Sequence, residues 1–190
     1  RTLMGQGMKV INSDDGFERY AKQAGLNLKQ MGSFTAKQTK LKDRLRTRAK
    51  RGTAYMHQHA IDGRLGLIMD STARDTARIE AEAQSMRYLG YDTYMVFVNT
   101  TLEVALKRNE MRPRSVPEPI VINSHRQIQK NIPKLRAIFG SKNFVEVDNS
   151  VEAEDVNIKV YKEIQKLVRS KPTSPMAQAW IDNELAKKRR

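Results

Sequence analysis

The sequence predicts an α/β protein in which a parallel sheet is flanked by helices on both faces. Short apolar segments alternate with longer segments of helical composition along the 190 residues. Residues 67–69 and 93–98 carry no charge, which is typical of strands covered on both sides. Polar residues follow two of the predicted strands directly. Because the carboxyl ends of parallel strands lie at one edge of a sheet, this pattern predicts a ligand site at that edge.

The first half of the chain is predicted to form two helices between its strands. Asp14 or Asp15 can cap a helix over residues 17–23. Residues 35–61 carry apolar side chains at three-to-four spacing, which predicts a long helix, although Gly52 interrupts the pattern. The remaining predicted segments of this half are a strand at residues 8–12, a loop at 25–33 and a strand at 67–69.

The second half continues the alternation. Gly90 ends a helix predicted over residues 75–89, and the β-branched and aromatic residues 93–98 predict a strand. Thr101 can cap a helix that reaches residue 111. Further predicted segments are a helix at 123–139 with a kink at Pro133, a strand at 143–147 and a helix at 152–168. We expect one domain over residues 1–170, then a linker and a basic tail at 171–190.

The charge of the chain favours polyanionic partners. The formal net charge is +14 and the pI is about 10.1, so we expect a nucleotide or nucleic acid as partner. The absence of cysteine excludes disulfides and thiolate metal sites. No apolar run approaches the length that spans a bilayer, and no membrane partner is expected. The first residue is Arg1 and not methionine, so we expect a cleaved or trimmed product.

Half of the excess charge lies in residues 35–52, which hold eight cations and Asp43 as their one acid. A helix of this composition can follow a nucleic-acid backbone. The alternative is a solvated helix face, and the absence of aromatic residues before Tyr55 gives no indication of base stacking. The candidate nucleic-acid-binding residues are Lys42, Arg44, Arg46, Arg48, Lys50 and Arg51.

Asp14 and Asp15 lie just past the first predicted strand. A hydroxyl that accepts a phosphoryl group needs a base within hydrogen-bond reach, and a carboxylate at the sheet edge can serve. We take Asp14 as the candidate catalytic base and Asp15 as a candidate substrate-binding residue. The alternative for either carboxylate is a helix cap.

Asp70 ends the strand at residues 67–69 and is followed by Ser71 and Thr72. A carboxylate at this point can bind the acceptor or hold Mg²⁺ through water, and the two hydroxyls can add oxygens. We therefore expect all three to bind substrate, and we expect no directly ligated metal. The alternative is again a helix cap, since this tripeptide is ordinary before a helix.

Arg108 and Arg112 are four residues apart, so we expect them on one face of a helix. Arg114 follows after Pro113. Arginine side chains stabilise charge on a transferring phosphoryl group, so Arg108 and Arg112 are candidate catalytic residues and Arg114 a candidate substrate-binding residue. The alternative is a solvated basic surface.

With these residues in view, the chain resembles the P-loop kinases of the polynucleotide kinase and zeta-toxin group, particularly phage-encoded members. The stretches that carry the resemblance are residues 9–15 (Lys-Val-Ile-Asn-Ser-Asp-Asp), 66–72 (Gly-Leu-Ile-Met-Asp-Ser-Thr) and 106–112 (Leu-Lys-Arg-Asn-Glu-Met-Arg), the last leading to Val116-Pro117. The resemblance covers about two thirds of the chain.

The resemblance implies a fold with adenylate-kinase-like strand order and a role for each candidate residue. Asp14 matches the general base, and Asp70 matches the aspartate that helps hold the acceptor or the water shell of the metal. Arg108 and Arg112 match the lid arginines that grip the donor phosphates. The central strand of such a sheet leads into a glycine-rich phosphate loop.

That loop, Gly-x-x-x-x-Gly-Lys-Ser/Thr, is not in the sequence. We therefore expect the sheet to lack its first, central strand. In one interpretation the chain is a fragment whose upstream part holds the strand and the loop. In the other, the domain has lost catalysis. The first interpretation is favoured because a gap in the middle of a sheet leaves strand edges unpaired.

The function expected from the resemblance is transfer of a phosphoryl group from ATP or GTP, with Mg²⁺, to a hydroxyl of a nucleic-acid end or a nucleotide sugar. The alternative is a non-catalytic basic module, such as a phage particle component that binds nucleic acid or another phage protein. The expected location is the host cytoplasm or, for the alternative, the virion.

Overall fold

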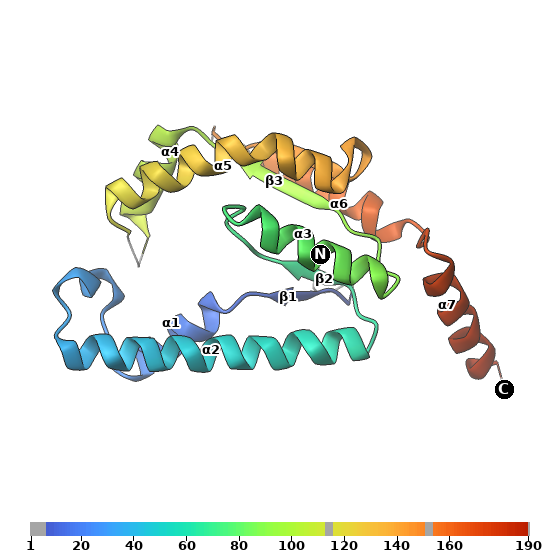
Figure 1. Cartoon of the computed structure of the whole chain (residues 1–190), viewed down its shortest axis with the longest axis horizontal. Coiled ribbons are helices and arrows are strands. Elements are labelled where there is room, and N and C mark those ends of the chain that lie inside the picture. Colours follow the sequence, from blue (N-terminus) through green and yellow to red (C-terminus); the bar gives the residue numbers. More distant parts are fainter. Residues whose placement is uncertain (1–6, 113–115, 151–153, 190) are drawn as a thin grey trace. The chain divides into compact units, whose positions relative to one another are not determined.

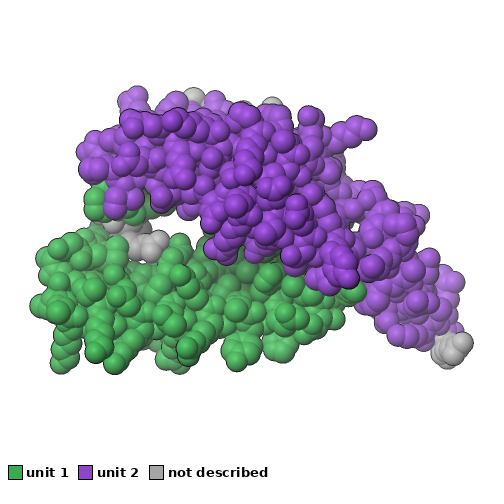
Figure 2. All heavy atoms as spheres, in the orientation of Figure 1, with its two compact units in different colours: residues 1–71, 107–117 green, residues 72–106, 118–190 purple. Residues whose placement is uncertain are grey.

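The computed structural model describes residues 7–112, 116–150 and 154–189, which divide into two compact units (Figure 2). Unit 1 comprises Arg1–Ser71 and Lys107–Pro117, and unit 2 comprises Thr72–Leu106 and Glu118–Arg190. The predicted α/β class with short parallel strands is confirmed, and helices make up most of the described chain. The predicted domain boundary at residue 170 stays a prediction.

Unit 1 contains two strands that pair in parallel, joined through helices (Figure 1). Their register places Lys9 opposite Leu67 and Ile11 opposite Met69. The crossover between them includes a 27-residue helix that begins at a capping box formed by Thr35 and Gln38. The elements are β1 (Lys9–Ile11), α1 (Asp14–Gln23), the 3₁₀ segment η2 (Leu28–Ser33), α2 (Ala36–Asp62) and β2 (Leu67–Met69).

Helices α1 and α2 pack closely against each other. Phe17 and Ala21 of α1 are buried, as is Ala49 of α2. A Cβ atom added at Gly16 would lie 3.7 Å from the Cβ of Ala49, so small residues on both helices permit this close approach. The contact holds the start of α1, which directly follows β1, against the middle of α2.

Unit 2 contains the second parallel pair, with Met95 opposite Phe144 and Asn99 opposite Asp148. Its core is formed where α3 and α5 pack together beside these strands. Leu135 of α5 has no exposed surface, and the rings of Phe97 and Phe144 stack with centroids 6.1 Å apart. The elements are α3 (Thr76–Tyr88), β3 (Met95–Asn99), α4 (Leu102–Met111, of which residues from Lys107 belong to unit 1), α5 (Glu118–Phe139), the 3₁₀ turn η3 (Ser141–Asn143), β4 (Phe144–Asp148), α6 (Glu154–Arg169) and α7 (Pro175–Lys188).

Three sequence-based expectations about these elements were wrong. Asp14 and Asp15 lie in the first turn of α1 and do not precede it, because the helix begins directly after Ser13. The predicted loop at residues 25–33 contains η2, whose first turn is capped by the side chain of Asn27. The helix predicted from residue 123 begins at Glu118, since Pro119 is tolerated in a first turn.

The strands form two sheets of two strands each in the described residues, β1–β2 and β3–β4. A two-stranded sheet is marginal by itself, so each pair depends on the helices of its own unit. In the described part of the chain, no helix combines the length and apolarity needed to cross a bilayer.

Replacing Leu135 with alanine is expected to lower the free energy of unfolding by about 2–5 kcal/mol, because the side chain is fully enclosed in the core of unit 2. Denaturant unfolding of the purified variant measures the change. Leu185→Ala serves as control, since the Leu185 side chain is exposed. Equal losses in both variants would contradict the described core.

Asp148 ends β4, and the Ser150 hydroxyl and backbone N–H, both bonded to its carboxylate, hold the pKa of Asp148 below its ordinary value of 3.8. A lowered pKa stabilises the folded chain above the unfolded value, and this contribution is lost as the pH falls through the folded value. We expect Ser150→Ala to raise the pKa of Asp148, as followed by its side-chain carboxyl signal in an NMR titration. An unchanged pKa would show that the Ser150 hydroxyl is not its cause, since the variant keeps the backbone N–H.

Candidate active site at the ends of β1 and β2

The carboxyl ends of β1 and β2 lie side by side and are joined by the side chain of Asn12. The last paired residues are Ile11 and Met69, so Asn12 and Asp70 follow them directly. Asn12 Nδ2 donates a hydrogen bond to Asp70 Oδ2 at 2.7 Å, and Asn12 Oδ1 accepts one from the backbone N–H of Asp14, also at 2.7 Å. One amide therefore connects the second strand to the first turn of α1.

The carboxylate of Asp14 is held from the other side by α2. Arg46 Nη1 donates to Asp14 Oδ1 and forms an ion pair with it. The Arg46 guanidinium also lies over the ring of Phe17, 4.9 Å from its centroid. Both partners of the ion pair remain about one-third exposed, at 39% for Asp14 and 32% for Arg46, so a substrate can reach the carboxylate.

Arg46 was a candidate for nucleic-acid binding, and the structure places it against α1 instead. Its charge is directed to Asp14. Lys42, a second candidate, forms an ion pair with the neighbouring Asp43 at 3.2 Å. The other four candidates, Arg44, Arg48, Lys50 and Arg51, are exposed on α2.

The remaining oxygen-bearing candidates follow the two strands. Asp15 is exposed beside Asp14 in the first turn of α1, and Asp70 is exposed at the end of β2. Ser71 and Thr72 are exposed and lie outside any helix or strand. Ser71 belongs to unit 1 with Asp14 and Asp70, whereas Thr72 is the first residue of unit 2.

Arg108 and Arg112 belong to unit 1, together with the strand ends. The expectation that both lie on one helix was wrong, because α4 ends at Met111. The N–H of Arg112 bonds to Asn109 O at 3.4 Å in a tighter turn, and a residue before proline disfavours helical geometry. Neither arginine forms an ion pair with a described residue. Arg114 lies outside the described residues.

The side chain of Asn109, which lies between Arg108 and Arg112 in the sequence, bonds to the backbone of Val116. Its Nδ2 donates to Val116 O at 2.8 Å, and its Oδ1 accepts the N–H of Val116 at 2.9 Å. This bidentate contact bonds the last turn of α4 to the residue before Pro117. The two hydrogen bonds therefore hold Asn109 and Val116 together.

Two residues of the site were missed by reasoning from sequence. From the sequence alone, Asn12 is part of a motif and has no role of its own, and Arg46 is a candidate contact to nucleic acid. The spacing of Asn12 and Asp14, two residues apart after a strand, is the local signal for a side chain that bonds to the backbone. No local signal identifies Arg46 as the partner of Asp14, because 32 residues separate them.

The donor set suits Mg²⁺ only in part. Mg²⁺ is usually bound by one or two carboxylates, water and the phosphates of the substrate, and Asp70 can supply such a carboxylate. The described residues contain no group of three or more histidine, aspartate or glutamate side chains that could hold a metal by themselves. The triphosphate of a nucleotide fits less well, since the sequence has no glycine-rich loop of the P-loop pattern.

The model of the zeta toxin family matches residues 31–172, which is more than half of the chain. No curated protein and no solved structure gave a significant match.

The bond between Asn12 and Asp70 is open to a double-mutant cycle. We expect Asn12→Ala and Asp70→Ala to be coupled by roughly 0.5–1.5 kcal/mol in the free energy of unfolding, because each removes the partner of the other. Asn12→Ala paired with Asp15→Ala is the control cycle, since Asn12 bonds to the backbone of Asp14 and not to Asp15. Equal coupling in both cycles would contradict the described connection.

Proposed function

Because the chain belongs to the zeta toxin family, we propose that it takes part in nucleotide-dependent phosphoryl transfer, with its chemistry at the ends of β1 and β2. The observation that carries the proposal is the connection of Asp14 and Asp70 through Asn12. Asp14 and Asp70 come from segments far apart in the sequence and follow the carboxyl ends of two paired strands, which supports a phosphoryl-transfer site at this edge.

Asp14 is the proposed general base. Its carboxylate lies in the first turn of α1, is partly exposed, and is oriented by Arg46. In this position it can accept the proton of an acceptor hydroxyl as that oxygen bonds to phosphorus. Arg46 acts as a positioning residue, because it contacts Asp14 and keeps the carboxylate in one orientation.

Asp70 is proposed to hold the water shell of Mg²⁺ or the acceptor. Bound Mg²⁺ neutralises charge on the phosphates of the donor. Asn12 keeps Asp70 in place by its hydrogen bond, and Asp15, Ser71 and Thr72 offer further oxygens for the acceptor. This group is exposed, so an acceptor can approach it without a rearrangement of buried side chains.

Arg108, Arg112 and Arg114 are proposed to contact the phosphates. Arg108 and Arg112 are grouped with the strand ends in unit 1 and are without an ion-pair partner among the described residues. Arginine side chains bind phosphate oxygens with two parallel hydrogen bonds, so free guanidinium groups suit this role.

The backbone N–H groups that bind the donor phosphates are proposed to come from outside these 190 residues. The sequence has no P-loop pattern, and the described strands form two pairs where the family resemblance calls for one sheet with a further strand between them. A further parallel strand that leads into a glycine-rich loop would supply hydrogen-bond partners for strand edges and the backbone N–H groups that bind the phosphates.

The donor is proposed to be ATP, with GTP as the second possibility. The acceptor is proposed to be a hydroxyl of a nucleic-acid end or of a nucleotide sugar. Both acceptors carry phosphates, which agrees with the net charge of +14.

A second candidate function is that of a non-catalytic basic module that binds nucleic acid. The observation that favours it is the set of exposed cations on α2, which lies outside the candidate active site. Binding of nucleic acid without any binding of ATP would favour this second function over the first.

Asp14→Asn is expected to lower phosphoryl transfer by about 100-fold or more, because the amide cannot accept the proton. The assay follows label from γ-labelled ATP to 5′-hydroxyl oligonucleotides and to a panel of nucleotide sugars, with the product of the complete gene. Glu18→Gln is the matched control, since it removes one negative charge from an exposed position one turn further along α1.

Thermal unfolding of both variants shows whether the fold is retained. Unchanged turnover in Asp14→Asn would exclude Asp14 as the base. Failure of the unaltered protein to bind ATP or to label any acceptor would exclude the proposed function itself.

A further inference from the structure

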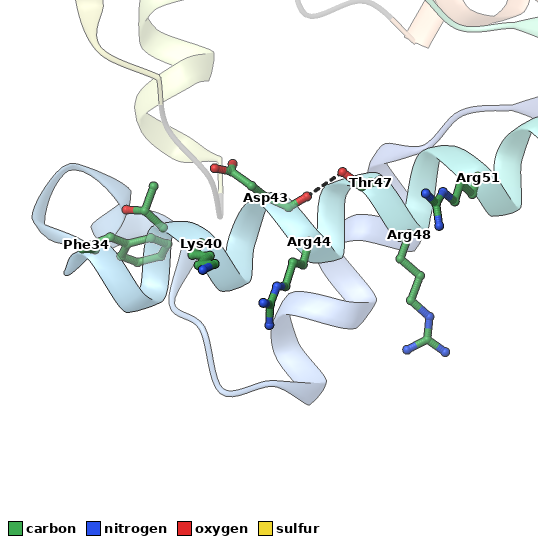
Figure 3. A pocket seen from close by; sticks show the side chains of 9 residues that line it. Phe34, Lys40, Asp43, Arg44, Thr47, Arg48 and Arg51 are labelled. Carbon is green, nitrogen blue, oxygen red and sulfur yellow. Dashed lines mark hydrogen bonds between the residues drawn. The ribbon is translucent and has the colours of Figure 1, made fainter.

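The outer side of α2 bears a shallow hollow of about 880 Å³ near the start of the helix. Four cations line it, namely Lys40, Arg44, Arg48 and Arg51, against the single acid Asp43. All four cations are exposed, and none of them forms an ion pair with a described residue. Figure 3 shows Arg44 and Arg48 extending from the same side of the helix.

The spacing of these cations places them in one row. Residues 40, 44, 48 and 51 follow one another at intervals of four, four and three, which is the repeat of a single helix face. With a rise of 1.5 Å per residue the row extends over roughly 16 Å, enough for several phosphates of one strand. The inner face of α2 is occupied by Ala49, buried against α1, and by Arg46, bonded to Asp14.

Aromatic side chains lie at both ends of the row. Phe34 lines the hollow beside Lys40 (Figure 3). Tyr55 follows Arg51 by four residues, continues the same face and is 72% exposed. Phe34 is half-buried and Tyr55 is exposed. Rings beside a row of cations are the combination that binds single-stranded nucleic acids, in which bases stack on the rings while cations follow the backbone.

We propose that this outer face of α2 binds the sugar-phosphate backbone of a single-stranded nucleic acid without sequence preference. The inference rests on the second candidate function above and specifies its ligand; it is independent of phosphoryl transfer, since Asp14 is bonded to Arg46 on the opposite side of the same helix. Arginine forks match phosphate geometry, and the row offers those of Arg44 and Arg51, whereas the guanidinium of Arg48 lies over the ring of Tyr20.

The same face is a poor match for a membrane surface. An interfacial helix buries a broad apolar face among the lipids. The apolar side of α2 is packed against α1, as the buried Ala49 and Phe17 show. On the rest of the helix, Tyr55 and Met56 are the exposed large hydrophobic residues.

The test measures binding of the full chain to fluorescent oligothymidylate and oligouridylate of about 12 nucleotides by anisotropy. Titrations between about 50 and 200 mM salt give the slope of log affinity against log salt. The slope is negative, because salt weakens the binding. The triple variant Lys40→Gln, Arg44→Gln, Arg51→Gln should make it less steep by about 2, since each lost contact accounts for about 0.7. Arg48 is kept, because its guanidinium lies over the ring of Tyr20 and supports the packing of α1.

The matched control is the triple variant Lys130→Gln, Lys142→Gln, Lys171→Gln, which removes the same charge from exposed positions of unit 2. Its slope should equal that of the unaltered chain. Equal slopes for both triple variants would overturn the proposal, as would binding of the unaltered chain to vesicles of anionic lipid in preference to the oligonucleotides. If the first triple variant unfolds, Arg44→Gln alone should still make the slope less steep by about 0.7. An unchanged slope in this variant would overturn the proposal.

The assay contains no nucleoside triphosphate, so its outcome is independent of phosphoryl transfer. A chain that transfers no phosphoryl group but shows the expected slopes retains this inference. A chain that transfers phosphoryl groups but shows equal slopes refutes it.

Discussion

The two hydrogen bonds of the Asn12 side chain are the constraint on which the candidate site depends. Strands β1 and β2 have three residues each, and a pair of such strands is weakly stable by itself. The Asn12 amide extends their pairing by a side-chain bond to Asp70 and orients the first turn of α1 through the N–H of Asp14. Without this amide, the Asp70 carboxylate and the first turn of α1 would be connected only through the backbone of short strands.

Helix α2 has two faces with different roles. Its inner face packs on α1 through small residues and holds the carboxylate of Asp14 through Arg46. Its outer face carries the exposed row of cations. Cations are spread along the whole of residues 35–52. Packing against α1 pairs Arg46 with Asp14, whereas Arg44, Lys50 and Arg51 stay exposed.

Strand ends could be predicted from the sequence because they depend on local patterns. Apolar runs followed by Asn-Ser-Asp and Asp-Ser-Thr predicted strands that end at Asn12 and just before Asp70, and the structure has them as the paired β1 and β2. The partners of these residues could not be predicted, since the bond from Asn12 to Asp70 spans 58 residues and that from Arg46 to Asp14 spans 32. The prediction that Arg108 and Arg112 share one helix was wrong for a local reason. Pro113 follows Arg112, and a residue before proline disfavours helical geometry.

If Asp14 and Asp70 border one phosphoryl-transfer site, a metal bound there with ATP lies near both residues. Paramagnetic broadening of the backbone amide signals of the complete protein by Mn²⁺ in the presence of ATP measures this. Mn²⁺ suits the same carboxylate, water and phosphate oxygens as Mg²⁺. We expect the signals of Asp14 and Asp70 to disappear together. Broadening that is confined to other parts of the chain and leaves both signals intact would contradict this expectation.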